Sequence, residues 1–209
     1  QELEPSSTTA KEAHKRETII LGKQYGQQGQ FERALQQFAA VLKDYPNDVP
    51  TMLDKGLTLT FMSRFDEART VLEQAEALQP QNSLVHGYLG DIAEEQGKLE
   101  ESVQQYQRAI QLTPPGSPAL PPLQTKLALV LGSQYLNQGK LGEARREYEK
   151  VLAAEPKNSV ARFKLAKVYH DLGDLPRSEE MLKSLLADNP SDLATKLRLG
   201  TLYLEQGNL

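Results

Sequence analysis

The residue types that most often carry enzyme chemistry are few and scattered in this chain of 209 residues. The three histidines, His14, His86 and His170, lie far apart, and none has a second histidine or a carboxylate at the spacing of metal ligands. Each is therefore expected to have a structural or surface role. The chain has no cysteine, which excludes disulfides, thiolate metal sites and cysteine nucleophiles.

Other patterns that would indicate catalysis are missing from the sequence too. It has no nucleophile elbow, no recognisable Ser–His–Asp set and no glycine-rich phosphate loop. Carboxylate pairs such as Glu94–Glu95 and Glu179–Glu180 recur, but such pairs on helices usually face solvent. We expect a protein that is not an enzyme and that uses no cofactor and no metal.

The charge and hydropathy of the chain narrow the classes of partner. With 24 basic and 28 acidic residues the net charge is −4, which argues against nucleic acid as a partner. No run of about 18 apolar residues exists, so we expect no membrane insertion by this segment. The first residue is Gln1, which indicates a fragment or a processed chain. A chain without cysteine suits the cytoplasm and the periplasm equally, so the localisation stays open.

Two markers repeat along the chain with one shared period. Prolines recur at spacings of 34, 34, 42 and 34 residues, at Pro46, Pro80, Pro114, Pro156 and Pro190. A turn residue recurs at the same spacings and then once more after 34, at Gly29, Ser63, Gly97, Gly139, Gly173 and Gly207. Because both markers lengthen at the same place, we interpret them as one internal repeat with one interruption.

Each period predicts a pair of helices. In the first period Leu21, Gly22 and Tyr25 share one helical face, and Ala34 and Phe38 share another. A small residue recurs at one place in each first helix, where it would let the second helix approach closely, at Gly22, Gly56, Gly90, Gly132, Ala166 and Gly200. Glycine inside a helix costs about 1 kcal/mol relative to alanine, so these glycines predict compensating close contacts.

The pattern of Leu–Gly, a tyrosine three residues later, then a small residue, a large apolar residue and a closing proline resembles the tetratricopeptide repeat (TPR) family. The resemblance covers Lys15 to Leu209 and implies an all-α, right-handed superhelical solenoid of TPR helix pairs, with five full repeats and the first helix of a sixth. Polar residues replace the family's large apolar ones at Thr18, Lys55, His86, Arg162 and Lys196.

The repeat boundaries divide the chain into four parts. Residues 1–9 are expected to form a flexible tail, because a capping-box pattern starts the first helix near Ala10. Residues 10–116 hold repeats 1–3, and residues 125–209 hold repeats 4 and 5 with a terminal helix. Between them, the proline-rich residues 117–124 form an insertion that is either a passive loop, a hinge or a docking segment.

The resemblance implies a function in protein–protein interaction, through a concave groove lined by the first helix of each repeat. The groove positions of the family correspond here to a mixed set of apolar and charged residues. The candidate peptide-binding residues are Lys23, Leu53, Asp54, Leu57, Phe61, Tyr88, Asp91, Glu94, Glu95, Lys126, Leu129, Phe163, Lys164, Lys167 and Arg198. The clamp for a C-terminal carboxylate that some members use is not expected, because Asp54 stands where it needs asparagine.

Charge is uneven along the array. Residues 1–104 carry 10 basic and 17 acidic side chains, whereas residues 105–209 carry 14 and 11. We therefore expect an acidic first part and a basic second part of the groove.

Three functions fit these features. The first is a non-catalytic scaffold or adaptor that binds a peptide or helix of an unknown protein partner in its groove. The second is a targeting or regulatory TPR module of a larger enzyme or of a membrane-anchored assembly factor. The third is a self-assembling structural protein, in which the Leu199–Tyr203 face of the last helix stacks on another copy.

Overall fold

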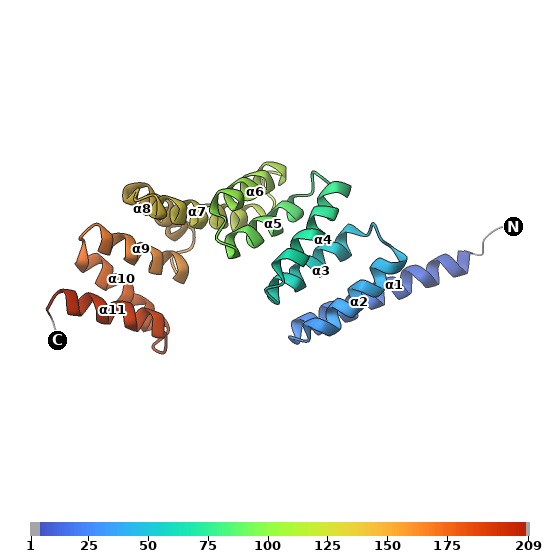
Figure 1. The fold of residues 1–209 in the computed structure, drawn as a ribbon, viewed down its shortest axis with the longest axis horizontal. Coiled ribbons are helices and arrows are strands. Elements are labelled where there is room, and N and C mark those ends of the chain that lie inside the picture. Colours follow the sequence, from blue (N-terminus) through green and yellow to red (C-terminus); the bar gives the residue numbers. More distant parts are fainter. Residues whose placement is uncertain (1–4, 208–209) are drawn as a thin grey trace. The chain divides into compact units, whose positions relative to one another are not determined.

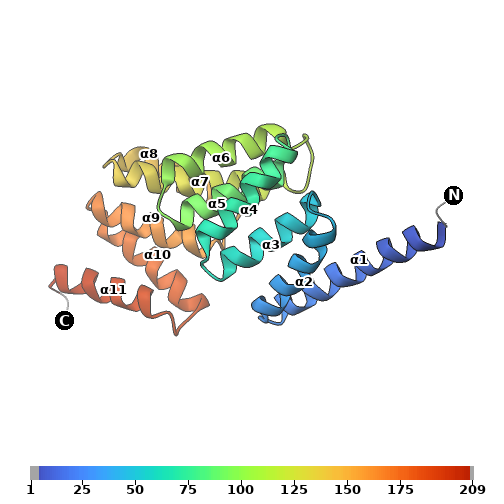
Figure 2. The ribbon, with the colours of Figure 1, turned by 45° about the vertical axis from the view of Figure 1, so that its right-hand side comes forward.

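The computed structural model describes the backbone of residues 5–207 and the side chains of residues 9–207, and these residues form helices joined by short turns (Figures 1 and 2). The helices are α1 (Pro5–Gln27), α2 (Phe31–Asp44), α3 (Val49–Phe61), α4 (Phe65–Leu78), α5 (Ser83–Glu95), α6 (Leu99–Leu112), α7 (Leu120–Asn137), α8 (Leu141–Ala154), α9 (Ser159–Asp171), α10 (Leu175–Asp188) and α11 (Leu193–Glu205).

Consecutive helices pack as pairs, α1 with α2 through α9 with α10, and α11 packs on α10. This arrangement confirms the expected fold class, an all-α solenoid of helix pairs. The chain forms two compact units that divide between Ser117 and Pro118. The first unit holds α1 to α6, and the second holds α7 to α11.

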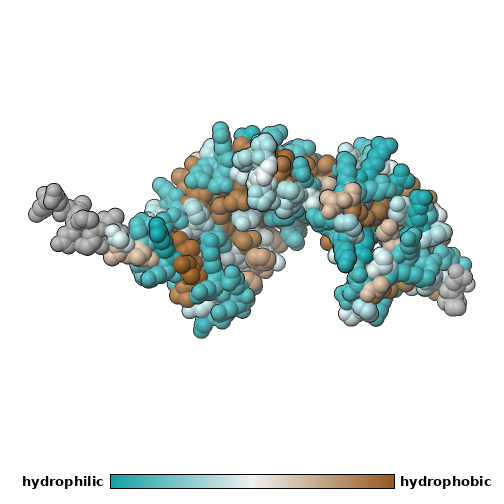
Figure 3. All heavy atoms as spheres, turned by 180° about the vertical axis from the view of Figure 1, so that it is seen from behind, coloured by the Kyte–Doolittle hydropathy of each residue, from teal (hydrophilic) through white to brown (hydrophobic). Residues whose placement is uncertain are grey.

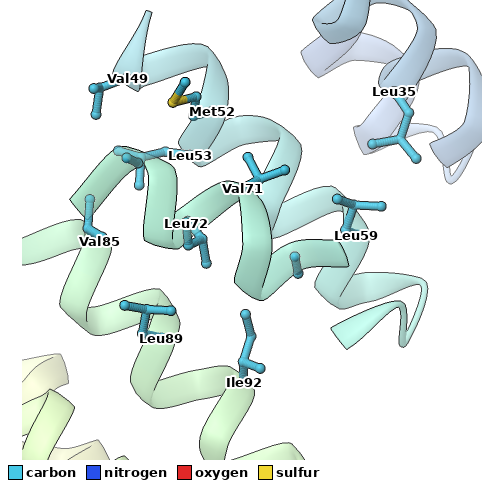
Figure 4. Packing of buried hydrophobic residues seen from close by; sticks show 12 residues of the cluster. Leu35, Val49, Met52, Leu53, Leu59, Val71, Leu72, Val85, Leu89 and Ile92 are labelled. Carbon is cyan, nitrogen blue, oxygen red and sulfur yellow. The ribbon is translucent and has the colours of Figure 1, made fainter. Parts of the chain in front are cut away.

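The core of the first unit is a continuous apolar cluster that runs from one helix pair to the next (Figure 4). Leu59 and Leu72 come from the two helices of one pair, while Val85, Leu89 and Ile92 come from the first helix of the next pair. Helix α3 is therefore covered on one side by its own partner α4 and on another by α5 of the following repeat. The second unit has corresponding clusters around Tyr148, Leu165 and Val151.

The close approach predicted at the helix glycines is present in four repeats. A Cβ atom on Gly22 would lie 2.6 Å from the Phe38 ring, and one on Gly132 would lie 2.5 Å from the Tyr148 ring. Gly56 and Gly90 meet the side chains of their second helices at similar distances. At Gly200 no described atom lies within 4 Å of a Cβ, because no second helix covers this face of α11 among the described residues.

The turn inside each pair requires a left-handed backbone. Gly29 has φ of 73°, and Ser63 adopts the same conformation, with φ of 57°, in the second pair. The turn is closed by a backbone hydrogen bond from Arg64 N–H to the Leu59 carbonyl, at 2.9 Å. Ser63 therefore holds a conformation that glycine adopts at lower cost.

The closing prolines lie where the period predicts them, two residues after each second helix ends; Pro46, for example, follows α2, which ends at Asp44. Side-chain caps then start the next first helix. Asp48 accepts a hydrogen bond from Thr51 N–H, and Asn158 accepts one from Ala161 N–H. These caps satisfy backbone donors that the first turn leaves unpaired.

Two helix starts differ from the sequence prediction. The first helix begins at Pro5 rather than near Ala10, so the expected tail of residues 1–9 is wrong for residues 5–9; residues 1–4 lie outside the described residues. Helix α7 begins at Leu120, inside the proline-rich insertion. Pro121 and Pro122 fit there because the first turn of a helix needs no donor from their nitrogens.

Candidate functional site

The first unit holds a pocket of about 490 Å³ between α1, α2 and α3, which we call the Phe61 pocket. Four of the predicted groove residues line it. These are Lys23, Asp54, Leu57 and Phe61. Phe38 and Gly22 also line it, so that the packing contact of the helix pair continues into the pocket wall.

Two stacked aromatic rings form one side of the Phe61 pocket. Phe61 ends α3 and Phe31 begins α2, and their ring centroids are 5.9 Å apart with an interplanar angle of 12°. Phe61 is 66% exposed, a large fraction for an aromatic side chain. In the face shown by Figure 3, patches of hydrophobic residues likewise reach the surface between hydrophilic ones.

An ion pair forms another side of the same pocket. The Lys23 ammonium lies 3.1 Å from an Asp54 carboxylate oxygen. Burial raises the pKa of Asp54, and the pairing with Lys23 offsets only part of that rise. The pocket thus combines apolar walls with one partly buried, paired carboxylate.

The structure gives other roles to several predicted groove residues of this unit. Leu53 is only 8% exposed and lies in the core cluster, so its prediction as a groove anchor is wrong. Tyr88 is half-buried against the same cluster, and burial, with Asp54 and Asp91 nearby, raises its pKa. Glu95, by contrast, is exposed.

The hydroxyl of Tyr106, a fully buried residue, lies within hydrogen-bond distance of the carboxylates of both Asp91 and Glu94. The Tyr106 oxygen lies 2.6 Å from the carboxylate of Asp91 and 3.0 Å from that of Glu94. Burial and the two carboxylates raise the pKa of Tyr106 well above its usual range. This structural contribution of the two acidic residues was not predicted from the sequence. The buried hydroxyl of a tyrosine that needs an acceptor was the signal available for it.

The second unit holds a pocket of about 450 Å³ lined by residues of α7, α9, α10 and α11, which we call the Lys164 pocket. Phe163, Lys164 and Lys167 of the predicted groove line it together with Val160. Three other predicted residues do not line it: Lys126 and Arg198 are half-buried elsewhere on α7 and α11, and Leu129 packs against the core.

Nearby carboxylates partly neutralise the positive charge of the Lys164 pocket. Lys167 pairs with Asp171 at 2.7 Å. Burial favours the neutral form of Asp171, but hydrogen bonds from Lys167 and His170 outweigh it and lower its pKa. Asp192 caps α11, where a hydrogen bond from Thr195 lowers its pKa.

The three histidines have the structural or surface positions expected for them. His86 is 4% exposed; one ring nitrogen contacts Gln105 and the other the Pro80 carbonyl, at 2.9 and 3.0 Å. His170 lies 2.6 Å from Glu205 on α11, an inter-repeat contact that its sequence spacing did not suggest. Across residues 9–207 no three His, Asp or Glu side chains are grouped to hold a metal ion.

A third pocket, of about 790 Å³, was not predicted. It lies between the early part of α1 and the later part of α2, lined on one side by Lys11, His14 and Lys15. Lys15 also pairs with Asp48 and lies over the Tyr45 ring, at 4.7 Å from its centroid. Its α1 side is formed by residues that the sequence already placed in the first helix, and the packing of α1 against the end of α2 brings the two sides together.

Three tetratricopeptide repeat models match the sequence, over residues 20–48, 53–117 and 135–195, and together they cover more than half of the chain. No curated protein matches it. Among solved structures, similar folds include PilW, described as a type IV pilus biogenesis factor; it is 19% identical, with a TM-score of 0.75 over 93% of this chain and 86% of that one.

Two further structures show the same fold. Pseudomonas aeruginosa pilF is 20% identical, with a TM-score of 0.74 over 95% of this chain and 87% of that one. YrrB, described as a TPR protein with an unusual peptide-binding site, is 18% identical, with a TM-score of 0.63 over 99% of both chains. The matched models and the recurring helix pair, with its close glycine contacts, agree: this chain belongs to the tetratricopeptide repeat family.

Proposed function

We propose that the chain is a non-catalytic scaffold that binds an extended or helical segment of a partner protein on the surfaces of its first helices. The observation that carries the proposal is the pair of pockets, one in each unit. Their volumes of about 490 and 450 Å³ fall within the usual range of roughly 300 to 1,000 Å³ for ligand sites.

The side chains of these pockets are better suited to binding a peptide than to catalysing a reaction. Phe61 and Phe163 offer aromatic surface of the type that dominates binding energy in protein interfaces. The charged groups beside them, Lys23 with Asp54 and Lys167 with Asp171, are arranged as ion pairs. Such pairs orient a ligand and do not by themselves provide a nucleophile.

Site-specific photo-crosslinking tests the proposal. A photoreactive amino acid is placed at Phe61 or at Phe163, and as a control at Gln107, an exposed residue of a second helix, α6. We expect the same partner to crosslink from Phe61 and Phe163 and not from Gln107. A partner that crosslinks only from Gln107 would place binding on the second helices and refute the proposal.

A module of a larger enzyme or of a membrane-anchored assembly factor remains an alternative function. The fold similarity to PilW fits the assembly factor. None of the described helices combines the length and the apolar character needed to cross a membrane. Binding of a pilus or membrane-complex subunit in the crosslinking experiment would favour this alternative.

Self-association through α11 is a second candidate function. Leu199 and Tyr203, which the sequence suggested for this contact, are half-buried, and the Tyr203 hydroxyl donates a hydrogen bond to Glu179 at 3.1 Å. The open face is instead formed by three leucines that are 63–67% exposed and flank Gly200, namely Leu193, Leu197 and Leu204.

Light scattering after gel filtration tests self-association. If α11 joins two copies, Leu197→Gln with Leu204→Gln should convert an oligomer to a monomer. A wild-type chain that stays monomeric at roughly 100 times the concentration used in the binding experiments would exclude this function.

A further inference from the structure

The Lys164 pocket is positively charged at its rim and apolar inside. We infer that it takes a partner segment in which a carboxylate lies beside a large apolar side chain, an inference that rests on the proposed function and specifies the ligand of one of its two pockets.

The charges of the pocket favour an anion. Lys164 is half-buried and has no ionic partner in residues 9–207, whereas Lys167 shares its charge with Asp171. Asp192, the acidic residue that lines the pocket, already accepts hydrogen bonds from Thr195 and from Ala194 N–H. The ammonium of Lys164 is therefore the charge left to be matched by a ligand.

Two helices also begin at this pocket. The first turn of α9 contributes Ser159 and Val160, and the first turn of α11 contributes Ala194 and Thr195. The amino-terminal end of a helix carries a partial positive charge, and at α11 the Asp192 carboxylate already offsets it. The end of α9, capped by the neutral Asn158, therefore adds to the attraction of Lys164 for an anion.

The inner walls provide the apolar half of the site. Val160 is 49% exposed, and Phe163 and Leu136 are half-buried beside it. The pocket volume of about 450 Å³ lies within the range of roughly 300 to 1,000 Å³ that ligand sites span. The pocket therefore has room for one large apolar side chain together with a carboxylate. Transfer of the apolar side chain from water onto these walls supplies affinity, and the carboxylate supplies orientation.

Selection from a random library of displayed 12-residue peptides tests the inference without a known partner. On the wild-type chain we expect enrichment of peptides with Asp or Glu within four residues of Leu, Ile, Met, Phe or Trp. The Lys164→Gln, Lys167→Gln variant should lose the acidic preference. The control variant Arg146→Gln, Lys157→Gln removes the same charge from exposed residues outside the pocket and should keep the preference.

Fluorescence anisotropy on the selected peptides then measures the two halves of the site. Replacing the acidic residue by its amide, or using the Lys164→Gln, Lys167→Gln variant, should weaken binding roughly tenfold at 0.05 M salt, as expected for two partly exposed charges. The difference should shrink at 0.5 M salt, because charges are screened over a few ångströms there. Amidation of the peptide's C-terminus decides whether a side chain or a chain end supplies the carboxylate.

The outcomes separate this inference from the function on which it rests. Peptides selected without an acidic preference, or with a basic one, whose binding falls when Phe163 is replaced by alanine, overturn the acidic ligand and leave groove binding intact. Peptides unaffected by changes at Phe163 and at Phe61, or a library that yields no binder, count against the proposed function itself.

Discussion

Replacing Gly132 by alanine tests the packing that holds each helix pair together. An added Cβ would lie 2.5, 2.7 and 2.9 Å from three carbons of the Tyr148 ring. The ring would have to move by roughly 0.9 Å to restore an ordinary contact of 3.4 Å. Tyr148 is fully buried, and its hydroxyl lies 3.2 Å from that of Ser133, so the ring has little freedom to move.

Two opposing terms set the magnitude. Alanine favours a helix over glycine by about 1 kcal/mol, whereas overpacking a core costs about 1–3 kcal/mol. Because the ring is held on all sides, the larger cost applies, and we expect a net destabilisation of about 1–2 kcal/mol. For a chain of this size that lowers the melting temperature by about 2–8 °C.

Gly200→Ala is the matched control in the same unit. No described atom stands within 4 Å of its Cβ, so only the helix preference changes. We expect stabilisation of about 0.5–1 kcal/mol. Thermal unfolding followed by circular dichroism compares the two variants. If Gly132→Ala is as stable as the wild type, or if both variants shift the melting temperature in the same direction, the close contact does not govern the pairing.

Three further changes have defined outcomes. Ser63→Gly relieves a left-handed backbone and should raise the melting temperature, by a stability gain of about 1 kcal/mol. Asp48→Asn keeps a capping side chain but removes its charge and so the ion pair with Lys15, which should cost about 1 kcal/mol at pH 7. Although burial favours the neutral form, hydrogen bonds from Lys15 and Thr51 lower the pKa of Asp48, so the wild-type advantage in urea unfolding should disappear as the pH falls through the lowered pKa. His86→Leu leaves the Pro80 carbonyl without its partner, so hydrogen exchange should accelerate in the turn before α5.

The helix pairs could be predicted from the sequence because their markers act locally. Gly22 and Phe38 are separated by one short turn, and the period repeats that relation in later pairs. The contacts between pairs could not be predicted equally well. Leu53 and Leu57 stand one turn apart on the same helix, yet only Leu53 belongs to the core cluster that includes Val85 of the next repeat. The angle between pairs decides this burial, and the period does not encode that angle.

The start of α7 shows a second limit of the sequence analysis. A dense run of prolines predicts an irregular segment, because proline removes a backbone donor and restricts the residue before it. At Pro121 and Pro122 the cost of the missing donor vanishes, since the first turn of a helix has no acceptors for its donors. Composition alone therefore could not distinguish a loop from a helix start, and the extra residues lengthen α7.

Two buried tyrosine hydroxyls contact a polar side chain of the first helix fifteen residues earlier in the chain. Tyr106 and Tyr148 lie fifteen residues after Asp91 and Ser133, and each buried hydroxyl contacts that earlier polar side chain. Where an apolar residue occupies the position of the tyrosine, the earlier side chain has no buried hydroxyl with which to form a hydrogen bond.

The repeats without such a tyrosine follow this rule. Phe38 comes fifteen residues after Lys23, and Leu72 fifteen after Leu57; both earlier side chains line the Phe61 pocket. Lys167, with Leu182 at the same distance, lines the Lys164 pocket. A buried hydroxyl requires a hydrogen-bond partner and a phenyl or leucyl side chain does not. The identity of one core residue in the second helix thus determines whether a buried hydroxyl contacts the first helix; Ser133 makes such a contact and still lines the Lys164 pocket.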